Sequence, residues 1–384
     1  MKPIIATGRP AILVVPVPFS NRLDWKLAAN RLSTVLETLR PRLDLTASNP
    51  TKAGLHYSPM LLEALASPGG LDYSPDPRGL APAREALGLG PHTLLSASTS
   101  EAYGWLFKLL CNPGDAILVP RPSYPLFEFL AKLESVEAVQ YSLRYAEGWW
   151  LDFDSLERQI PPNAKAILFV HPNNPTGSYL KRGELERLAA LCARRDLTLI
   201  SDEVFADYPL MEDASRVATL GGNGQCLTFV LGGLSKSVGL PQLKAAWVTA
   251  SGPQAAEAAR GLELIADTYL SVSTPVQCAL PVLLREGAAV RAQIQARTRT
   301  NLQTLQQSGL RPLQVEGGWY AVIPTPRTRT EEDWAIALLT EEQILTQPGY
   351  FYDFESDGWL VLSLLTPEAE FAAGVQAIER TFTV

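Results

Sequence analysis

A lysine between two apolar segments is the residue of this sequence best suited to covalent chemistry. Lys236 lies in the Gly- and Ser-containing stretch LGGLSKSVGLPQLKAAW, after CLTFVLG and before LKAAWVTAS. Taken alone, such a lysine is most simply interpreted as a surface loop residue. To form a Schiff base, its amine must be partly desolvated and near other positive charge, so that enough of it is neutral at pH 7. Lys244, further along the same stretch, is the candidate for that charge.

Polar and aromatic side chains follow four other predicted strands. Thr99 and Ser100 open a helix after LLSAS, where backbone N–H groups bind anions, although such hydroxyls also suit a plain helix cap. Tyr124 follows AILVP and presents a ring that either stacks on a planar ligand or packs in the core. Asn174 lies between prolines in HPNNPTG. Asp202 ends a very apolar strand, where a carboxylate needs a cationic partner.

The elements that must position these residues alternate along the chain from residue 94. Continuous apolar strands alternate with amphipathic helices, which predicts an α/β fold with a mainly parallel sheet sandwiched by helices. Ligands bind such sheets beyond the carboxyl ends of the strands, so we expect these side chains to meet there. Together they suit pyridoxal phosphate: a lysine for the aldehyde, a carboxylate for the ring nitrogen, an amide for the phenolate and a helix N-terminus for the phosphate.

Length and composition indicate a large domain with a smaller one attached. We predict an N-terminal arm and part of a small domain in residues 1–45, a large cofactor-binding domain in 46–284 and a C-terminal α+β small domain in 285–384. A net charge of −7 without a Lys/Arg block argues against nucleic acid and anionic membranes as partners. Four scattered cysteines lack metal-ligand spacing, and prolines interrupt the apolar runs of the first 20 residues, so we expect a cytoplasmic protein.

Three segments, HPNNPTG, SDEVFADY and GLSKSVGLPQLK, give the chain a family resemblance. In order and spacing the sequence resembles the fold-type-I pyridoxal-phosphate enzymes of the aspartate aminotransferase superfamily, the class I/II aminotransferases, from about residue 20 to the end. The resemblance implies Lys236 as the aldimine lysine and proton shuttle, Asp202 as partner of the pyridine nitrogen and Asn174 as partner of the phenolate oxygen. The other implied cofactor contacts are Tyr124, stacked on the ring, and Thr99, Ser100 and Ser235 at the phosphate.

One further tyrosine implies an assembly. Tyr73, in YSPDPRGL, matches the family's tyrosine that reaches the phosphate of the neighbouring subunit. The resemblance therefore implies a homodimer with shared active sites.

Four positions depart from the family pattern. Lys244 stands where the family usually has arginine, which keeps the charge but loses the bidentate fork on phosphate. Phe205 stands where tyrosine is frequent, so one hydrogen bond to the phenolate is missing, and we expect the protonated aldimine to persist to higher pH. Ser48 replaces a glycine, and Val361 stands where the family has the arginine that binds the substrate α-carboxylate.

Because Val361 replaces the carboxylate-binding arginine, the sequence does not determine the class of substrate. Either another cation replaces the arginine, for which Arg78, Lys52 and Arg121 are candidates, or the substrate is not a standard α-amino acid. The aromatic segment 349–352 either faces the cleft or belongs to the core. We expect an aminotransferase that moves an amino group from an amino acid to a 2-oxo acid. The alternatives are a C–S lyase or a decarboxylase using the same cofactor, and a non-catalytic binding domain.

Overall fold

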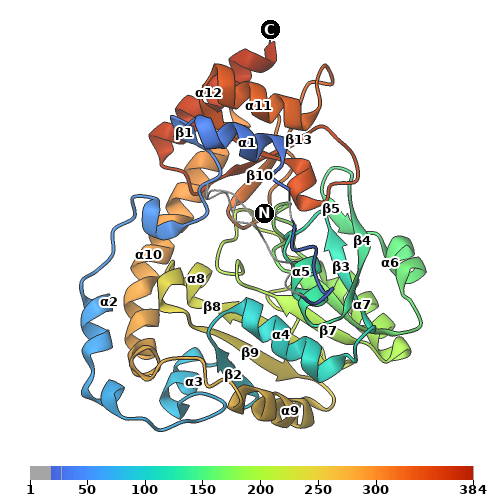
Figure 1. Ribbon diagram of the computed structural model, residues 1–384, viewed down its shortest axis with the longest axis vertical. Coiled ribbons are helices and arrows are strands. Elements are labelled where there is room, and N and C mark those ends of the chain that lie inside the picture. The colour runs from blue at the N-terminus through green and yellow to red at the C-terminus, as the bar shows by residue number, and fades with distance from the viewer. Residues whose placement is uncertain (1–18, 27, 384) are drawn as a thin grey trace.

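An eight-stranded sheet forms the centre of the molecule (Figure 1). The computed structural model describes residues 19–26 and 28–383, so our expectation for the first residues of the chain lies outside its described part. The strands, in spatial order, are β2 (Thr93–Ser96), β9 (Ala246–Ser251), β8 (Thr228–Gly233), β7 (Thr198–Asp202), β6 (Ala164–Val170), β3 (Ala116–Arg121), β4 (Glu137–Tyr145) and β5 (Trp149–Leu151). Strands β8, β7, β6, β3 and β4 pair in parallel, which confirms the mainly parallel sheet.

Two helical layers cover the sheet because alternate residues of each strand face opposite sides. In β6, Leu168 belongs to the core shared with α4 (Thr99–Leu110), α5 (Phe127–Leu133) and α9 (Ala255–Asp267). Its neighbour Ile167 belongs to the core under α6 (Phe153–Gln159) and α7 (Arg182–Arg195) (Figure 1). Continuous apolar strands are therefore buried on both faces, as the sequence predicts.

Strands β4 and β5, at one end of the sheet order, are absent from our sequence-based prediction. Strand β4 is exposed at both ends and buried only from Tyr141 to Leu143, so it lacks the continuous apolar run that identified the central strands. Strand β9 also differs from its neighbours, because it runs antiparallel to both β2 and β8. Strand β2 nevertheless points the same way as β8, so the carboxyl ends of β2, β8, β7, β6 and β3 lie at one edge.

A second group of elements comes from both ends of the chain. Its three-stranded antiparallel sheet has the order β10 (Tyr320–Pro324), β13 (Trp359–Ser363), β12 (Gln347–Pro348). Close to it, β1 (Leu43–Asp44) pairs with β11 (Ile344–Leu345), and α1 (Arg31–Thr38) packs on α11 (Glu331–Glu341) near α12 (Glu368–Thr383) (Figure 1). The division of the chain at residues 45 and 285 stays a prediction.

A long helix links the two groups. Helix α10 (Thr274–Gln306) packs against α2 (Met60–Glu63) and α3 (Ala81–Leu87) in its first half and against α12 further on. The short 3-10 helices are η1 (Pro50–Lys52), η2 (Ala64–Ala66), η3 (Pro68–Leu71), η4 (Pro241–Leu243) and η5 (Gly349–Tyr352).

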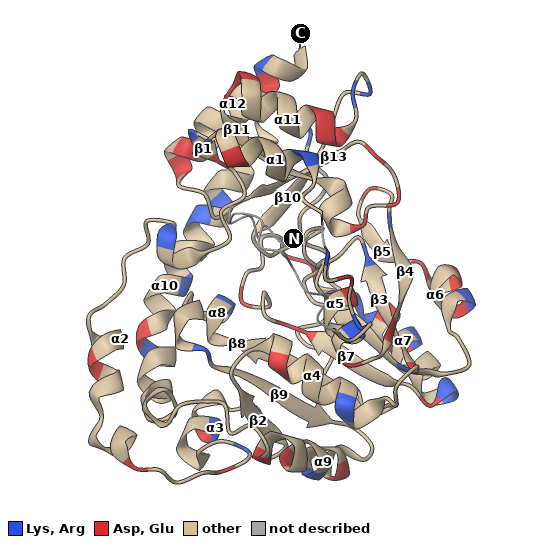
Figure 2. Cartoon of the chain, viewed as in Figure 1, with Lys and Arg blue, Asp and Glu red and all other residues tan. Residues whose placement is uncertain are grey.

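Charge is spread over the outside of this fold. Both signs are intermixed on the outer helices, whereas strands β2, β8 and β9 carry neither (Figure 2). Among the helices that the structure describes, none has both the length and the apolar composition to cross a bilayer.

Candidate active site

A cavity of about 310 Å³ opens at the edge where the parallel strands end. Pockets of this size and larger bind small molecules and cofactors. Seven of the nine predicted site residues line it, which are Thr99, Ser100, Tyr124, Asn174, Asp202, Ser235 and Lys236. Segments far apart in the sequence therefore converge as the fold class predicts.

Lys236 occupies the one-turn helix α8 (Leu234–Ser237) directly after β8. Its Nζ lies 3.5 Å from the carbonyl oxygen of Ser48, 4.9 Å from the ring centre of Trp319 and 5.6 Å from that of Phe205. Burial of the amine lowers the pKa of Lys236 to about 8, against the opposing effect of the Asp202 carboxylate. A substantial fraction of the amine is thus neutral near pH 7 to 8, which a nucleophilic lysine requires.

Asp202 is the last residue of β7, and its side chain is buried. Its Oδ2 accepts a hydrogen bond of 2.8 Å from the Tyr103 hydroxyl, and its Oδ1 accepts one of 3.1 Å from the Val204 N–H. Burial raises the pKa of Asp202, whereas these two hydrogen bonds and the charge of Lys236 oppose the rise. The cationic partner expected for this carboxylate is therefore Lys236.

The N-terminus of α4 supplies hydroxyls to the cavity. Ser98 caps the helix by accepting a 3.1 Å hydrogen bond from the Glu101 N–H, and the Glu101 carboxylate accepts one of 2.7 Å from the Ala97 N–H. Ser98 thus fills the plain N-cap role, and Glu101 adds a hydrogen bond to the residue before the cap. Thr99 and Ser100 are left facing the cavity at the positive end of the helix.

The loop after β6 separates the roles of its two asparagines. Asn173 is buried, where its amide group donates to the Pro122 carbonyl and to Thr176 Oγ1 at 2.9 Å each and accepts from Ser123 Oγ at 2.8 Å. Asn174 lines the cavity instead, and its Oδ1 is buried without a hydrogen-bond partner. An unpaired buried amide oxygen is costly, so Asn174 is a group that a ligand would satisfy.

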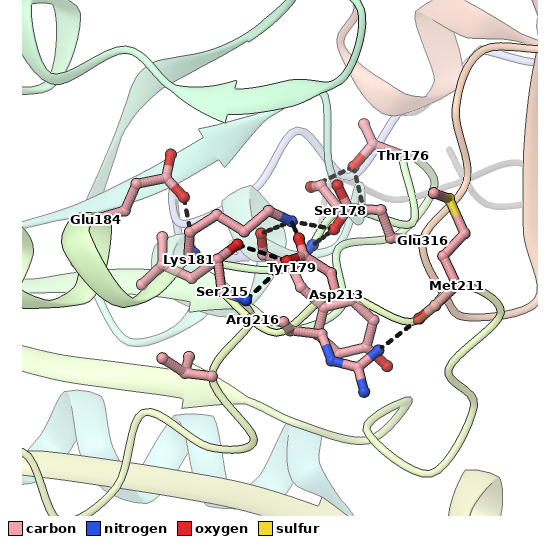
Figure 3. Close-up of polar contacts among 12 residues, drawn as sticks. Thr176, Ser178, Tyr179, Lys181, Glu184, Met211, Asp213, Ser215, Arg216 and Glu316 are labelled. Carbon is pink, nitrogen blue, oxygen red and sulfur yellow. Dashed lines mark hydrogen bonds and ion pairs between the residues drawn. The ribbon is translucent and has the colours of Figure 1, made fainter.

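A polar cluster holds this loop against the segment that precedes β10 (Figure 3). Glu316 accepts a 3.0 Å hydrogen bond from the Tyr179 N–H and pairs with Lys181 Nζ. The Arg216 guanidinium lies 4.4 Å from the centre of the Tyr179 ring. The cluster joins the wall that bears Asn174 to the strand that begins with Tyr320.

The remaining two predicted site residues lie outside the cavity of the single chain. Tyr73 is 79% exposed on the segment between η3 and α3. Lys244 follows η4 with an exposed side chain. Neither lines the cavity.

The three cations considered as replacements for the missing arginine also lie elsewhere. Arg121 forms an ion pair of 2.9 Å with Glu355. Arg78 donates hydrogen bonds to the Pro91 and Thr93 carbonyls. Lys52 is exposed on η1.

Apolar and neutral polar residues surround Val361, the position where the family has its carboxylate-binding arginine. Val361 is fully buried in the core, opposite Val322 of β10 and opposite Gln347 of β12. Gln347 lines the cavity, and its Oε1 accepts a hydrogen bond from the Tyr352 hydroxyl. Tyr320 lines the same wall, with its ring centre 6.5 Å from that of Tyr352. Of segment 349–352, only Tyr352 lines the cavity, whereas Phe351 belongs to the core.

Sequence reasoning missed Tyr103, Gln347 and Tyr320 as site residues. Tyr103 sits on the buried face of α4, where an aromatic residue is typical of a core position. Gln347 belongs to a two-residue strand that has no recognisable pattern. Tyr320 follows the Gly-Gly bend at the start of a predicted strand, and this position was the only available signal.

The groups of the cavity fit pyridoxal phosphate. Lys236 supplies an amine for the aldehyde, Asp202 a carboxylate for the ring nitrogen, and Asn174 an amide N–H₂ group that can donate to the phenolate oxygen. Thr99 and Ser100 supply hydroxyls at a helix N-terminus, where a phosphate binds favourably.

Comparison with known sequences places the chain in a family. The sequence model of the family described as "Aminotransferase class I and II" matches residues 71–378. The alanine aminotransferase of Mycobacterium tuberculosis (strain ATCC 25618 / H37Rv) is 27% identical over 372 residues, covering 88% of this chain and 84% of that protein. The glutamate-pyruvate aminotransferase AlaA of Escherichia coli (strain K12) is 29% identical over 222 residues, covering 54% of this chain and 55% of that protein.

Solved structures of the same fold cover nearly the whole chain. An aminotransferase from Escherichia coli matches with a TM-score of 0.83 at 21% identity, over 96% of this chain and 99% of that chain. A double mutant of Thermus thermophilus aspartate aminotransferase matches with a TM-score of 0.80 at 23% identity, over 95% of this chain and all of that chain. These likenesses show the fold.

Because the family match spans most of its length, the chain belongs to the class I and II aminotransferase family, whose members use pyridoxal phosphate. The resemblance stated from the sequence is confirmed, as is the expectation of a pyridoxal-phosphate-dependent aminotransferase.

Proposed function

We propose that this chain transfers an amino group between an amino donor and a carbonyl acceptor, with Lys236 as its catalytic residue. The observation that carries the proposal is that the buried Lys236 and Asp202 line one cavity at the carboxyl ends of the strands. When bound, pyridoxal phosphate supplies an aldehyde that condenses with amines and a ring that withdraws electrons.

The other lining residues hold the cofactor. Asp202 keeps a proton on the ring nitrogen through a charge-assisted hydrogen bond, which contributes about 1.5–3 kcal/mol. Asn174 donates its amide N–H to the phenolate oxygen, and the Tyr124 ring stacks on the pyridine. Ser235 and the Thr99 and Ser100 hydroxyls bind the phosphate. The lining of the cavity by these residues supports the assignment.

Lys236 moves the proton on which the reaction depends. With the cofactor bound, its neutral amine would remove the proton from the substrate carbon that bears the nitrogen and would return it to the C4′ atom of the cofactor, acting first as base and then as acid. A pKa of about 8 suits both steps, because both protonation states are populated near neutral pH, with about one amine in ten neutral at pH 7 and about half at pH 8.

Of the two predicted residues outside the cavity, Tyr73 acts only in an assembly with a second copy. Tyr73 reaches the phosphate of the neighbouring subunit in a homodimer, and Lys244 supplies positive charge on the phosphate side. The exposure of Tyr73 and of the apolar side chains on the same segment supports such an interface, since Leu71 is 91% and Leu62 72% exposed. A cytoplasmic location, supported by four free cysteines, belongs to the same proposal.

The test is a pair of half-reactions followed by absorption. A panel of amines and amino acids is added to the holoenzyme, and a carbonyl acceptor is added afterwards. Loss of the visible band with a donor and its recovery with an acceptor support amino transfer. Release of ammonia with pyruvate, or of carbon dioxide, without any acceptor would instead establish the lyase or decarboxylase alternative.

A further inference from the structure

The described residues that line the cavity carry no spare positive charge. Lys236 is the only lysine or arginine among them, and Asp202 is the only carboxylate. The two charges already offset each other, because the carboxylate raises the pKa of the lysine and the lysine lowers that of the carboxylate. The cofactor adds a phosphate of about two negative charges at neutral pH. Among the described residues of one chain, none therefore offers a free cation to a substrate carboxylate in this cavity.

Burying a carboxylate without a cationic partner is strongly unfavourable. Three nearby cations are engaged outside the cavity. Arg121 pairs with Glu355, Arg78 binds backbone carbonyls beside β2, and Arg297 of α10 donates to the Ala53 carbonyl.

The wall opposite the sheet instead offers neutral hydrogen-bonding groups. Gln347 and Val361 are register partners, so their side chains lie on the same face of the small sheet. The Tyr352 hydroxyl donates a hydrogen bond to Gln347 Oε1, and Tyr320 lines the same wall. The amide N–H₂ of Gln347 and the two phenol hydroxyls suit an amide or hydroxyl group, and the rings suit an apolar one.

We infer that the substrates carry an uncharged group on the carbon that bears the amine: primary amines and amino acid amides, with the corresponding aldehydes and ketones as acceptors. This inference rests on the proposed function. The donor amine becomes a carbonyl compound and the carbonyl acceptor becomes an amine, so the two half-reactions balance without an outside oxidant. Gln347 is the residue that gives the wall its neutral character.

Binding of two matched, unreactive ligands tests the inference without turnover. 3-Phenylpropionamide and 3-phenylpropionate differ only in the terminal group, a neutral amide in one and a carboxylate in the other. Calorimetry on the holoenzyme measures their dissociation constants. We expect the amide to bind at least about 10-fold more tightly, a ratio that corresponds to about 1.4 kcal/mol. Equal or tighter binding of the acid would overturn the inference, as would no binding of the amide.

A positive charge introduced at Gln347 should shift the binding preference from the amide toward the acid. Gln347→Arg places a cation on the cavity wall. Val361→Arg would instead bury the cation in the core, because Val361 is fully buried. We expect Gln347→Arg to bind the acid at least about 10-fold more tightly than the parent does. Gln347→Met, which removes the amide without adding charge, should still prefer the neutral ligand. An unchanged affinity for the acid in Gln347→Arg would count against the inference.

Kinetics separate this inference from the proposed function. Phenylethylamine, phenylalaninamide and phenylalanine are compared as donors to the holoenzyme by loss of the visible band, corrected for the neutral fraction of each amine. We expect both uncharged donors to react at least about 10-fold faster than phenylalanine. Faster reaction of phenylalanine would overturn only the substrate class, whereas no reaction with any amine or amino acid would overturn the proposed function as well.

Discussion

The hydroxyl of Tyr103 donates a 2.8 Å hydrogen bond to Oδ2 of Asp202, and both residues are buried. The tyrosine comes from the helix that follows the first strand of the sheet, and the aspartate ends a strand three places away in the sheet order. This bond opposes the rise in the pKa of Asp202 that burial causes. Tyr103 thus helps to keep the carboxylate ionised, which its role at a protonated ring nitrogen requires.

Replacing Tyr103 by phenylalanine should move the acid limb of the activity–pH profile. Without the hydrogen bond, the pKa of Asp202 rises further, so the ionised form is lost at a higher pH. We expect the acid limb of kcat/KM to shift upward by about 1 unit, given a hydrogen bond of about 1.5 kcal/mol to a charged group. Tyr141→Phe is the matched control, because it deletes another buried hydroxyl, bonded to the Leu168 carbonyl under the opposite helical layer. An equal shift in both variants would contradict the role of Tyr103.

The pKa of Lys236 can be measured directly on the cofactor-free protein. Competitive labelling with acetic anhydride across pH, read by mass spectrometry, should give a midpoint of about 8 for Lys236. Asp202→Asn removes the carboxylate that raises this pKa, so the midpoint should fall below that of the parent. Exposed Lys52 serves as the internal reference. A Lys236 midpoint equal to that of Lys52 would show that burial does not lower its pKa.

Phe205→Tyr should lower the pH at which the colour of the bound cofactor changes. Phe205 lines the cavity beside Lys236, and an added hydroxyl there would donate to the phenolate oxygen of the cofactor. The phenolate oxygen would then interact less strongly with the proton on the imine nitrogen of the bound cofactor. That nitrogen would therefore lose its proton at lower pH. For a hydrogen bond of about 1.5 kcal/mol we expect a fall of about 1 unit. A spectrophotometric titration whose midpoint stays unchanged or rises would contradict the placement.

The proposed homodimer gives Tyr73 a measurable function. We expect Tyr73→Phe to weaken binding of pyridoxal phosphate by about 10-fold, because one hydrogen bond to a charged group is lost. Equilibrium dialysis measures the affinity, and analytical ultracentrifugation shows whether the variant keeps the mass of a dimer. Tyr269→Phe is the control, since Tyr269 is also exposed but contacts Trp105 of its own chain. A monomeric parent protein would overturn the shared site.

The sequence predicted that residues from different strands would meet in one site. Parallel strands end at one edge of a sheet, so residues such as Asn174 and Asp202, placed directly after or at the end of apolar strands, had to meet. Gln347 and Tyr352 were not placed in the site by the sequence, because a two-residue strand and a 3-10 turn have no period that assigns a face. The position of Gln347 depends on pairing with β13, which is a tertiary contact. Strand β4 was missed for the related reason that a strand exposed at both of its ends lacks a continuous apolar run.

The central claim is that Lys236 carries the cofactor, and reduction of the holoenzyme with borohydride tests it most directly. Peptide mass spectrometry should find the reduced cofactor on Lys236, and Lys236→Ala should lose both this adduct and about 10²–10⁴-fold in turnover. Lys132→Ala, which removes an exposed lysine of α5, should retain both. Attachment of the cofactor to another lysine such as Lys244, or an unchanged turnover in Lys236→Ala, would contradict the account.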